Sequence, residues 1–554
     1  MDTKEFLMGK AKDAYTYFGA VKKDRGYIFR LLAPNADQVS IIGDFNNWEP
    51  SKMRGYKTGI YSVTIKDAKL GDRYQFVIKD KAGNEVKKID PFARKINLLE
   101  NSAVITDDSY KFKNKKVKTK DLNIYEVHLG SLFKDGSKSK AEILDRLLIH
   151  LVSNNFTHIK LMPVAEHSSY KSMGYVSSGF FAISERYGEA VNIRKFIDSC
   201  HGKGLGVICE LDISQFDNFT YGLRDFDGTR IFDYDAEDIH ENYYGSINFD
   251  FSKNTNKSYI KSVISYYLDE FNLDGISLSN LENLIYWQGD KNRGINKVNV
   301  EFLREITNVI SISKALSLGS FNGIYDFDLR FDYVFDNSTR PLVRVLQKEP
   351  ILRDNFRSDI YKFISGENKN KILGFNHIDS YLNEARVTMK MLGDTKKFDQ
   401  LKTLFTLIYC QNSKKQVFMG DEIGDLKTWS IHENVDFINI DEGKNIFNKF
   451  YQDLADLYLT NEILSNTDSE TEILDIEGYS IFAYKRVFDD KELLVINNLT
   501  DLDYLIKSAY NLNEILNTED LAYGGSGNVN GTIKVNEKIK IMAYGSAIFE
   551  IKKG

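Results

Sequence analysis

The chain has 554 residues, and 79 acidic against 73 basic side chains give it a formal net charge of −6 at pH 7. Hydrophobic residues make up 42% and charged residues 27%, which is typical of a globular protein and excludes a disordered or collagen-like chain. No run of about eighteen apolar residues occurs, the N-terminus lacks the apolar segment of a secretory signal, and the slight acidity argues against nucleic-acid binding. We therefore expect a cytoplasmic protein that binds neither membranes nor nucleic acids.

The cysteines and aromatic residues exclude few further classes of protein. Cys200, Cys209 and Cys410 are too few and too widely spaced for a disulfide framework or a zinc site, so we expect buried thiols, no metal and no cofactor. Aromatic residues reach 13%. They are typical of sugar-binding surfaces and of large β-rich cores alike.

The chain begins with a region of short strands. Between residues 20 and 110, apolar or alternating runs such as YIFRLL and RYQFVIKD are separated by Asn, Gly and Pro. The basic stretch 111–120 interrupts this pattern and is typical of a linker. We predict an N-terminal β-sandwich over residues 1–115.

From residue 122 onward, strand-like segments alternate with long amphipathic segments, which is typical of βα units around a parallel sheet. About eight strands in roughly 330 residues favour a closed (β/α)8 barrel, predicted over residues 116–465. Short strands with Gly and Asn turns then predict a C-terminal β-sandwich over residues 466–554. The expected fold class is therefore multidomain α/β, with a central TIM barrel between two β-sandwiches. The expected barrel strands are NIYEVHLG, THIKLMPV, GVICELDI, LDGISLSN, ALSLGSF, YVFDN, KILGFNHID and KKQVFMG.

Several motifs occur in one order along the chain: FRLLAPNADQVSIIGDFNNW and KIDPFAR, then IYEVHLGS (124–131), THIKLMPVAEH (157–167), MGYVSSGFFAISERYG (173–188), FMGDEIG (418–424) and LNTEDLAYGGSGNVN (516–530). Together they resemble glycogen (1,4-alpha-glucan) branching enzymes of glycoside hydrolase family 13. The first two resemble the family 48 carbohydrate-binding module of these enzymes, and the last resembles their C-terminal sandwich. The resemblance covers almost the whole chain and implies a scaffold for retaining glycosyl transfer.

Such transfer needs a carboxylate nucleophile and a carboxylic acid/base about 5–5.5 Å apart, at the C-terminal ends of neighbouring barrel strands. The family's nucleophile strand reads Asp-Gly-x-Arg-x-Asp, and here the same stretch runs from Asp274 to Ser279. The resemblance therefore places Ser279 at the nucleophile position and Ser277 at the position of the supporting Arg. Asp274 cannot substitute, because its odd spacing from residue 279 points it to the opposite face of the strand.

The other two catalytic carboxylates are also replaced. The family's Ile-Ala-Glu-Glu-Ser corresponds to residues 316–320, which places Leu318 at the acid/base position. A leucine side chain neither donates nor accepts a proton. The family's third carboxylate, in Ser-His-Asp-Glu, corresponds to Ile378. Its neighbour Asp379 would face the other way if the strand continues through it.

Further positions bear on sugar contact. The family's Asp-Trp-Val-Pro-x-His places Glu210 at a structural Asp and Gln215 at a sugar-contacting His. Tyr175 matches a Tyr of the −1 sugar subsite, His377 keeps a family His, and Trp48 lies in the GDFNNW turn of the carbohydrate-binding module. These last three residues are the candidates for α-glucan binding, although packing would explain each of them as well.

We interpret the chain as a catalytically degenerate homologue of branching enzyme that serves as an α-glucan-binding, regulatory or scaffolding protein in glycogen metabolism. Its expected partners are an α-glucan, either glycogen or a maltooligosaccharide, and an active glucan-metabolising enzyme. Two alternatives stay open. One is an active branching enzyme that makes α-1,6 branches with Glu210, Glu282 or Asp379 as substitutes. The other is a protein-interaction scaffold that binds no glucan.

Overall fold

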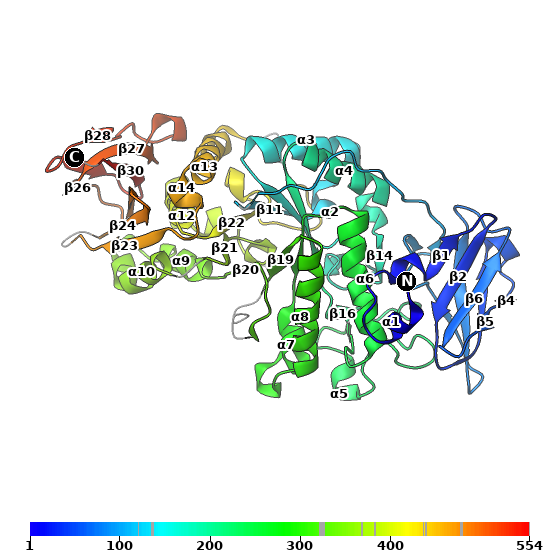
Figure 1. Ribbon diagram of the computed structural model, residues 1–554. Helices are drawn as coiled ribbons and strands as arrows, with labels where there is room; N and C mark the ends of the chain where they lie inside the picture. The colour runs from blue at the N-terminus through cyan, green and yellow to red at the C-terminus, as the bar shows by residue number, and fades with distance from the viewer. Residues whose placement is uncertain are drawn as a thin grey trace.

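The computed structural model describes residues 1–119, 121–134, 138–320, 327–366, 369–381, 384–435, 437, 440–476 and 480–552. The N-terminal strands lie at one end of the molecule, a barrel with its helices lies in the middle, and the C-terminal sheet lies at the other end (Figure 1). This arrangement confirms the expected fold class. The expected domain boundaries near residues 115 and 465 stay predictions.

The N-terminal part consists of two sheets with buried inner faces. One sheet contains β1 (Gly19–Lys22), β2 (Tyr27–Leu32), β6 (Ile60–Ile65) and β5 (Arg54–Gly55). The other contains β4 (Ser51–Lys52), β3 (Ala36–Gly43), β7 (Arg73–Asp80), β10 (Ser102–Val104) and β9 (Ile96–Asn97), with β8 (Glu85–Lys88) paired to β7. Buried Phe29 of β2 contacts buried Tyr74 of β7 edge to face, with ring centroids 4.9 Å apart. The alternating side chains thus join the two sheets into a sandwich.

Eight parallel strands close into a barrel, and each falls within one of the expected strand segments. In order around the barrel they are β11 (Asn123–Val127), β12 (His158–Leu161), β15 (Gly206–Leu211), β18 (Gly275–Leu278), β19 (Leu316–Gly319), β20 (Tyr333–Phe335), β21 (Lys371–Gly374) and β22 (Lys414–Phe418). The main surrounding helices are α3 (Lys140–Ser153), α4 (Ala190–Gly202), α6 (Asn254–Glu270), α8 (Lys297–Ile312), α9 (Thr339–Leu346), α10 (Arg357–Ile364), α12 (Lys397–Tyr409) and α13 (Glu442–Thr460).

The helices form where the sequence supplies both a cap and an apolar stripe. In α3, the Ser139 hydroxyl accepts a hydrogen bond from the Glu142 backbone N–H, and the Glu142 carboxylate accepts one from the Ser139 N–H. This reciprocal cap fixes the first turn of the helix. Leu144, Leu147 and Leu151 then recur at helical spacing and are buried against the barrel.

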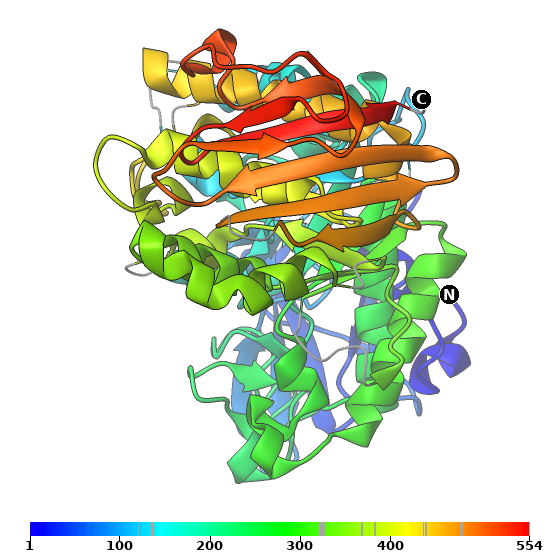
Figure 2. The same ribbon diagram turned by 90° about the vertical axis from the view of Figure 1, so that its left-hand side faces the viewer.

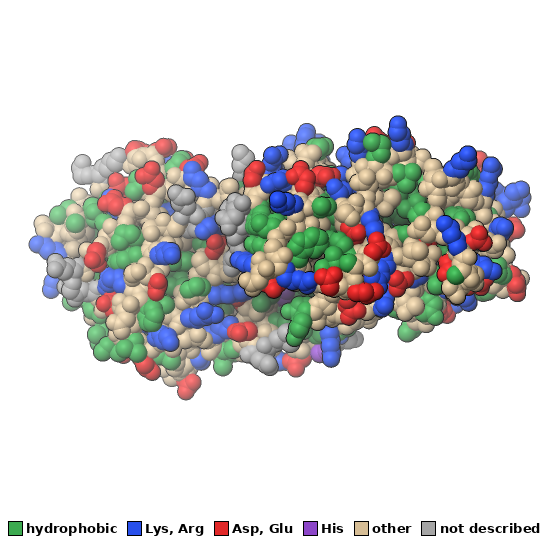
Figure 3. Space-filling model, turned by 90° about the horizontal axis from the view of Figure 1, so that it is seen from below, with side chains coloured by type: hydrophobic (Ala, Val, Ile, Leu, Met, Phe, Trp, Pro, Cys, Tyr) green, Lys and Arg blue, Asp and Glu red, His purple; other side chains and the backbone are tan. Residues whose placement is uncertain are grey.

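Short elements follow the carboxyl ends of the barrel strands. They are α2 (Leu129–Leu132), the hairpin of β13 (Ala165–Glu166) and β14 (Gly179–Ile183), the hairpin of β16 (Gln215–Phe216) and β17 (Ile247–Asn248), α5 (Glu237–His240), α7 (Leu281–Ile285) and α11 (Val387–Lys390). Both α5 and α7 lie at the lower edge of Figure 1, and Figure 3 looks onto that side of the molecule. Catalytic residues of (β/α)8 barrels come from this end of the strands.

The C-terminal part is a six-stranded sheet with a two-stranded sheet beside it. The larger sheet runs β23 (Glu470–Leu474), β24 (Ile481–Phe488), β25 (Lys491–Asn498), β30 (Ser546–Lys552), β27 (Asn511–Asn517) and β28 (Thr532–Ile533), and the smaller pairs β26 (Tyr504–Lys507) with β29 (Lys538–Ile541). Figure 2 shows the larger sheet facing the viewer. Helices α12 and α14 (Glu462–Ser465) contact β25, which attaches this part to the barrel. No described helix is long and apolar enough to cross a membrane.

Candidate functional site

The barrel interior brings together four of the residues that the family resemblance singles out. Ser277 on β18 lies beside Glu210 on β15 and beside Leu318 on β19 in the register of the parallel strands. Ser279 follows β18 directly and is two residues beyond Ser277, so both serines belong to the inward-facing set. The structure therefore places Glu210, Ser277 and Leu318 on neighbouring strands, with Ser279 directly after the middle strand.

Leu318 fills the barrel interior. Its side chain is 2% exposed and packs in one apolar cluster with residues from strands across the barrel: Leu122, Ile124, Ile208, Phe335 and Ile372. Only side chains that point into a closed barrel can reach strands on its opposite sides. Leu318 is therefore a hydrocarbon side chain in an apolar environment, and it can transfer no proton.

Ser279 is held by a neutral partner. Its backbone N–H donates to the Leu211 carbonyl at 3.2 Å, and its hydroxyl donates to the same oxygen at 3.4 Å. A serine hydroxyl becomes a nucleophile only beside a general base. Among the described contacts of Ser279, no such base accepts its proton.

A buried ionic network lies next to these positions. The Lys160 ammonium is 2.6 Å from a Glu126 carboxylate oxygen and 3.4 Å from a Glu210 carboxylate oxygen. Glu126 also accepts hydrogen bonds from Gln416 at 2.8 Å and from the His377 backbone N–H at 2.9 Å. Burial opposes ionisation of Glu126, but Lys160 and His377 hold its pKa down at about 2. Burial, together with the Glu126 charge, raises the pKa of Glu210.

Sequence analysis did not single out Lys160 or Glu126. Both lie in barrel-strand segments, at alternating positions that face inward like Glu210. A charged residue at an inward position of an otherwise apolar strand is the signal that could have identified them, because such a charge needs a partner inside the barrel. Their mutual contacts depend on which strands become neighbours.

Tyr175 and His377 contact each other. Their rings stack with centroids 5.4 Å apart and an interplanar angle of 24°, and the His377 Nδ1 lies 2.7 Å from a Glu126 oxygen. The Tyr175 hydroxyl is buried and makes no hydrogen bond to a residue that the structure describes. Burial and the nearby Glu210 and Glu126 carboxylates raise its pKa well above the ordinary tyrosine value. The pair keeps two sugar-contact candidates together.

The third aligned carboxylate position lies elsewhere. Strand β21 ends at Gly374, and residues 377–380 form a 3-10 turn, η9 (His377–Ser380), whose start is capped by Asn376. The condition under which Asp379 would face the other way, a strand that continues through it, is therefore not met. Ile378 is 53% exposed and lines a cavity of about 500 Å³ between α9 and α11, away from the apolar cluster that holds Leu318.

The substitute carboxylates named from the sequence lie on separate elements. Asp379 accepts a hydrogen bond of 2.6 Å from the Arg340 guanidinium, and Glu210 is paired with Lys160. Glu282 lies on α7, where burial raises its pKa. None of the hydrogen bonds or ion pairs of the described residues joins two of these three carboxylates.

Gln215 anchors a loop. Its amide nitrogen donates to Asp212 at 2.7 Å, and its amide oxygen accepts from Asn242 at 2.6 Å and from the Ser246 hydroxyl at 2.5 Å. Burial raises the pKa of Asp212 to about 6, although hydrogen bonds from Ser214, Asn280 and Gln215 oppose the rise. The Gln215 side chain is therefore engaged within the protein.

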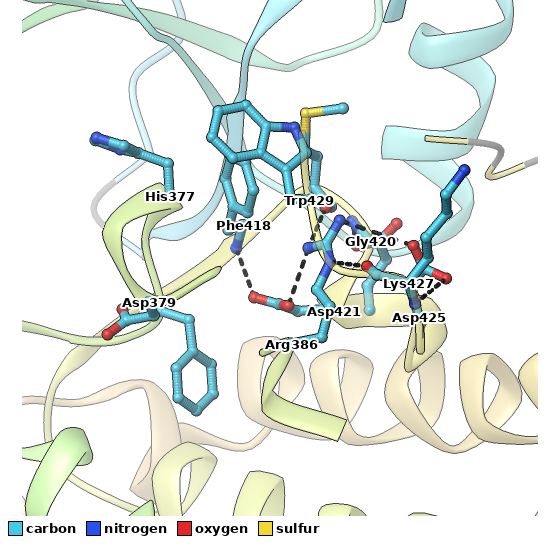
Figure 4. A network of polar contacts seen from close by, with 12 residues as sticks. His377, Asp379, Arg386, Phe418, Gly420, Asp421, Asp425, Lys427 and Trp429 are labelled. Carbon is cyan, nitrogen blue, oxygen red and sulfur yellow. Dashed lines mark hydrogen bonds and ion pairs between the residues drawn. The ribbon is translucent and has the colours of Figure 1, made fainter. Parts of the chain in front are cut away.

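The segment after β22 is fixed by a second network (Figure 4). Buried Arg386 donates to the Met419 carbonyl at 2.7 Å and lies 3.3 Å from Asp421, whose carboxylate accepts from the Phe418 backbone N–H at 3.2 Å. Burial raises the pKa of Asp421 to about 7, against the effect of Arg386. Gly420 has φ 98°, and a Cβ there would lie 2.8 Å from the Arg386 guanidinium, so glycine is required.

Trp48 lies in a rigid turn of the N-terminal sandwich. Its indole N–H donates to Asp44 at 3.0 Å, and Asp44 forms an ion pair of 2.9 Å with Arg73. The hydrogen bond from Arg73 lowers the pKa of Asp44 to about 2. Trp48 itself remains partly exposed with φ 63°, and the Arg73 guanidinium lies over its ring, 5.8 Å from the centroid. No group of three or more His, Cys, Asp or Glu side chains suited to a metal ion occurs among the described residues.

The chain is similar to known proteins along most of its length. Residues 17–93 match carbohydrate-binding module 48 (isoamylase N-terminal domain). The chain is 30% identical to the 1,4-alpha-glucan branching enzyme GlgB of Bacillus cereus strain AH187 and 29% identical to that of strain ATCC 14579, in both cases over 95% of this chain and 89% of the relative. A pullulanase of Anoxybacillus sp. LM18-11 complexed with maltotetraose has the same fold, with a TM-score of 0.77 and 14% identity over 99% of this chain and 89% of the pullulanase.

Proposed function

Because this chain belongs to the 1,4-alpha-glucan branching enzyme family but carries Ser279, Leu318 and Ile378 at the aligned catalytic positions, we propose that it is a catalytically degenerate member. In this proposal the protein binds an α-glucan without transferring glycosyl units. Its role is regulatory or scaffolding: in the cytoplasm it attaches to glycogen and brings an active glucan-metabolising enzyme to the polymer.

The observation that carries the proposal is the surroundings of Leu318. Retaining transfer requires a carboxylic acid at this place to protonate the leaving group and then to activate the acceptor. Leu318 is 2% exposed within an apolar cluster of the barrel interior, so a water molecule held there could not take over this role. A leucine at the expected acid/base position supports the loss of glycosyl transfer, independently of the replacements at Ser279 and Ile378.

Two of the three substitute carboxylates support the same conclusion. A nucleophile and an acid/base must face the scissile bond about 5–5.5 Å apart. Glu210 is in an ion pair with Lys160, and Asp379 caps its own turn and accepts from Arg340. These engagements disfavour the alternative of an active enzyme with substitute residues.

Three features support glucan binding. The N-terminal sandwich matches carbohydrate-binding module 48, and its partly exposed Trp48 is held in place through Asp44. Tyr175 and His377 remain stacked beside the emptied positions. We propose that Trp48 contacts the glucan, because a partly exposed flat ring suits the apolar face of a pyranose. We propose Tyr175 and His377 as further contacts because they lie together inside the barrel mouth.

Two assays test the two halves of the proposal. Purified protein incubated with amylose should produce no new α-1,6 branches and no new reducing ends; branches that disappear in Glu210→Gln, Glu282→Gln or Asp379→Asn would contradict the loss of catalysis. The protein should sediment with glycogen and release heat on titration with maltoheptaose. Trp48→Ala should weaken sedimentation while leaving the unfolding temperature of the barrel unchanged. Absence of both heat and sedimentation would favour the scaffold that binds no glucan.

A further inference from the structure

Two fully exposed tyrosines lie side by side near the mouth of the barrel. The long connection between β15 and α6 contains α5, the β16–β17 hairpin and a tight turn, and the tip of this turn carries Tyr243 and Tyr244. Their side chains are 95% and 89% exposed. The two rings meet edge to face, with centroids 5.5 Å apart at an angle of 86°.

The turn beneath these rings is held in one conformation. Asn242 donates its backbone N–H to the Ser246 carbonyl at 2.9 Å, and its side-chain oxygen accepts from the backbone N–H groups of Tyr244 at 3.0 Å and Ser246 at 3.2 Å. Gly245 has φ 84°, which allows the chain to reverse at this point. Side-chain and backbone hydrogen bonds together make a preformed tip, so little conformational entropy is lost when the tip binds a ligand.

The tip is also tied to the barrel mouth. The Gln215 side-chain oxygen accepts hydrogen bonds from both Asn242 and Ser246, and Gln215 is bound to buried Asp212 at the end of β15. Gln215 stands at the aligned position of a sugar-contacting His. Gln215 therefore holds the turn that carries Tyr243 and Tyr244 at the edge of the barrel mouth.

Packing does not explain why both rings face water. Neither side chain belongs to the hydrophobic clusters of the described core. α5, which ends just before this turn, lies at the lower edge of Figure 1, and Figure 3 shows hydrophobic side chains gathered over the middle of the same side. Exposed aromatic side chains that lie side by side are typical of a binding surface, whereas single exposed apolar side chains are common on any protein.

We propose that Tyr243 and Tyr244 form a stacking platform for an α-glucan chain at the rim of the barrel mouth. An α-glucan presents apolar C–H faces that pack on aromatic rings, and it presents hydroxyl groups that pair with the phenol oxygens. The platform binds one glucan chain at the rim, outside the region of Ser279 and Leu318. This inference rests on the proposed glucan-binding function and names the residues that perform it on the barrel.

The test compares the glucan binding of three variants with that of the parent protein, by electrophoresis through glycogen-containing gels and by titration with maltoheptaose. Tyr243→Ala/Tyr244→Ala should bind at least about fivefold more weakly, because stacking is lost. Tyr243→Phe/Tyr244→Phe keeps both rings and should bind within about twofold of the parent protein. Leu521→Ala removes a side chain that is 74% exposed in the C-terminal part and should leave binding unchanged.

The outcomes separate this inference from the proposed function. The double alanine variant should unfold at the parent temperature, because both side chains are exposed. If the double alanine variant binds glucan as tightly as the parent while Trp48→Ala binds it weakly, Tyr243 and Tyr244 are not a binding site. The proposed glucan-binding function is then still supported. If the phenylalanine variant loses as much affinity as the alanine variant, the glucan does not bind by stacking on the rings, and the proposal is contradicted. If the parent protein binds no glucan, both the platform and the proposed function fail.

Discussion

Tyr175 stacks on His377 with ring centroids 5.4 Å apart, and the two side chains thereby connect the β13–β14 region to the turn after β21. The Tyr175 hydroxyl is buried beside the Glu210 carboxylate without a hydrogen bond to a described residue. The ring therefore contributes packing, while the hydroxyl is available for a sugar hydroxyl only if the mouth opens.

Tyr175→Phe should raise the free energy of unfolding by about 1 kcal/mol, because it removes a buried polar atom that lacks a partner. Urea unfolding at neutral pH measures this change. Tyr175→Ala is the control: it removes the ring from His377 and should lower stability by about 3 kcal/mol. A loss of stability in Tyr175→Phe would mean that the hydroxyl is bonded to Glu210.

Lys160→Met should lower the free energy of unfolding by about 3–5 kcal/mol, because two buried carboxylates lose the cation between them. Adding Glu210→Gln to this variant should recover part of the loss, since Lys160 is the only described ion-pair partner of Glu210. Chemical denaturation of Lys160→Met, Glu210→Gln and the double variant gives the interaction free energy between the two side chains. Equal stability of Lys160→Met and the parent would show that the network is not ionised.

Leu318→Glu introduces a carboxyl group where the family resemblance places the acid/base, but it should not produce branching activity. Its new side chain enters the apolar cluster of the barrel interior and should lower stability by about 3–5 kcal/mol. Leu318→Met keeps the volume and should change stability by less than about 1.5 kcal/mol. Thermal unfolding and the amylose branching assay are measured together; branching activity in Leu318→Glu alone would overturn the proposed loss of catalysis.

Asp212 should make stability depend on pH. Burial raises its pKa from the ordinary 3.8 to about 6, so the folded protein holds this proton more tightly than the unfolded chain. The resulting stabilisation is complete below about pH 3.8 and is lost as the pH rises through 6, an effect of about 3 kcal/mol because one pKa unit corresponds to about 1.4 kcal/mol.

Asp212→Asn is the matched variant, since it cannot titrate. Its stability should be lower overall, because the amide meets the donating nitrogens of Gln215 and Asn280, but the slope between pH 4 and 6 should diminish. Unfolding temperatures measured across this range in both proteins provide the comparison. An unchanged slope would assign the pH dependence to other carboxyl groups.

Much of the fold could be predicted from local patterns. In each barrel strand, a short apolar run has side chains that alternate between the inside and the outside of the barrel. The family motifs predict neighbouring strands for Ser279 and Leu318, and in the structure the register of β18 and β19 pairs Ser277 with Leu318. The end of β21 was not predictable in this way. Asn376 caps a turn instead of extending the strand, and this local hydrogen bond points Ile378 to a different cavity.

The sequence by itself determined the scaffold, because motifs and short-range periodicity depend on residue type, and it has Ser279, Leu318 and Ile378 where the family resemblance places carboxylates. Only the tertiary structure decided the partners of the remaining charges. Lys160 lies between Glu126 and Glu210, and Gln215 holds the turn below Tyr243 and Tyr244, because barrel closure and a long loop bring distant segments into contact. Periodicity specifies the face on which a side chain lies, whereas the closed chain path specifies what it meets there.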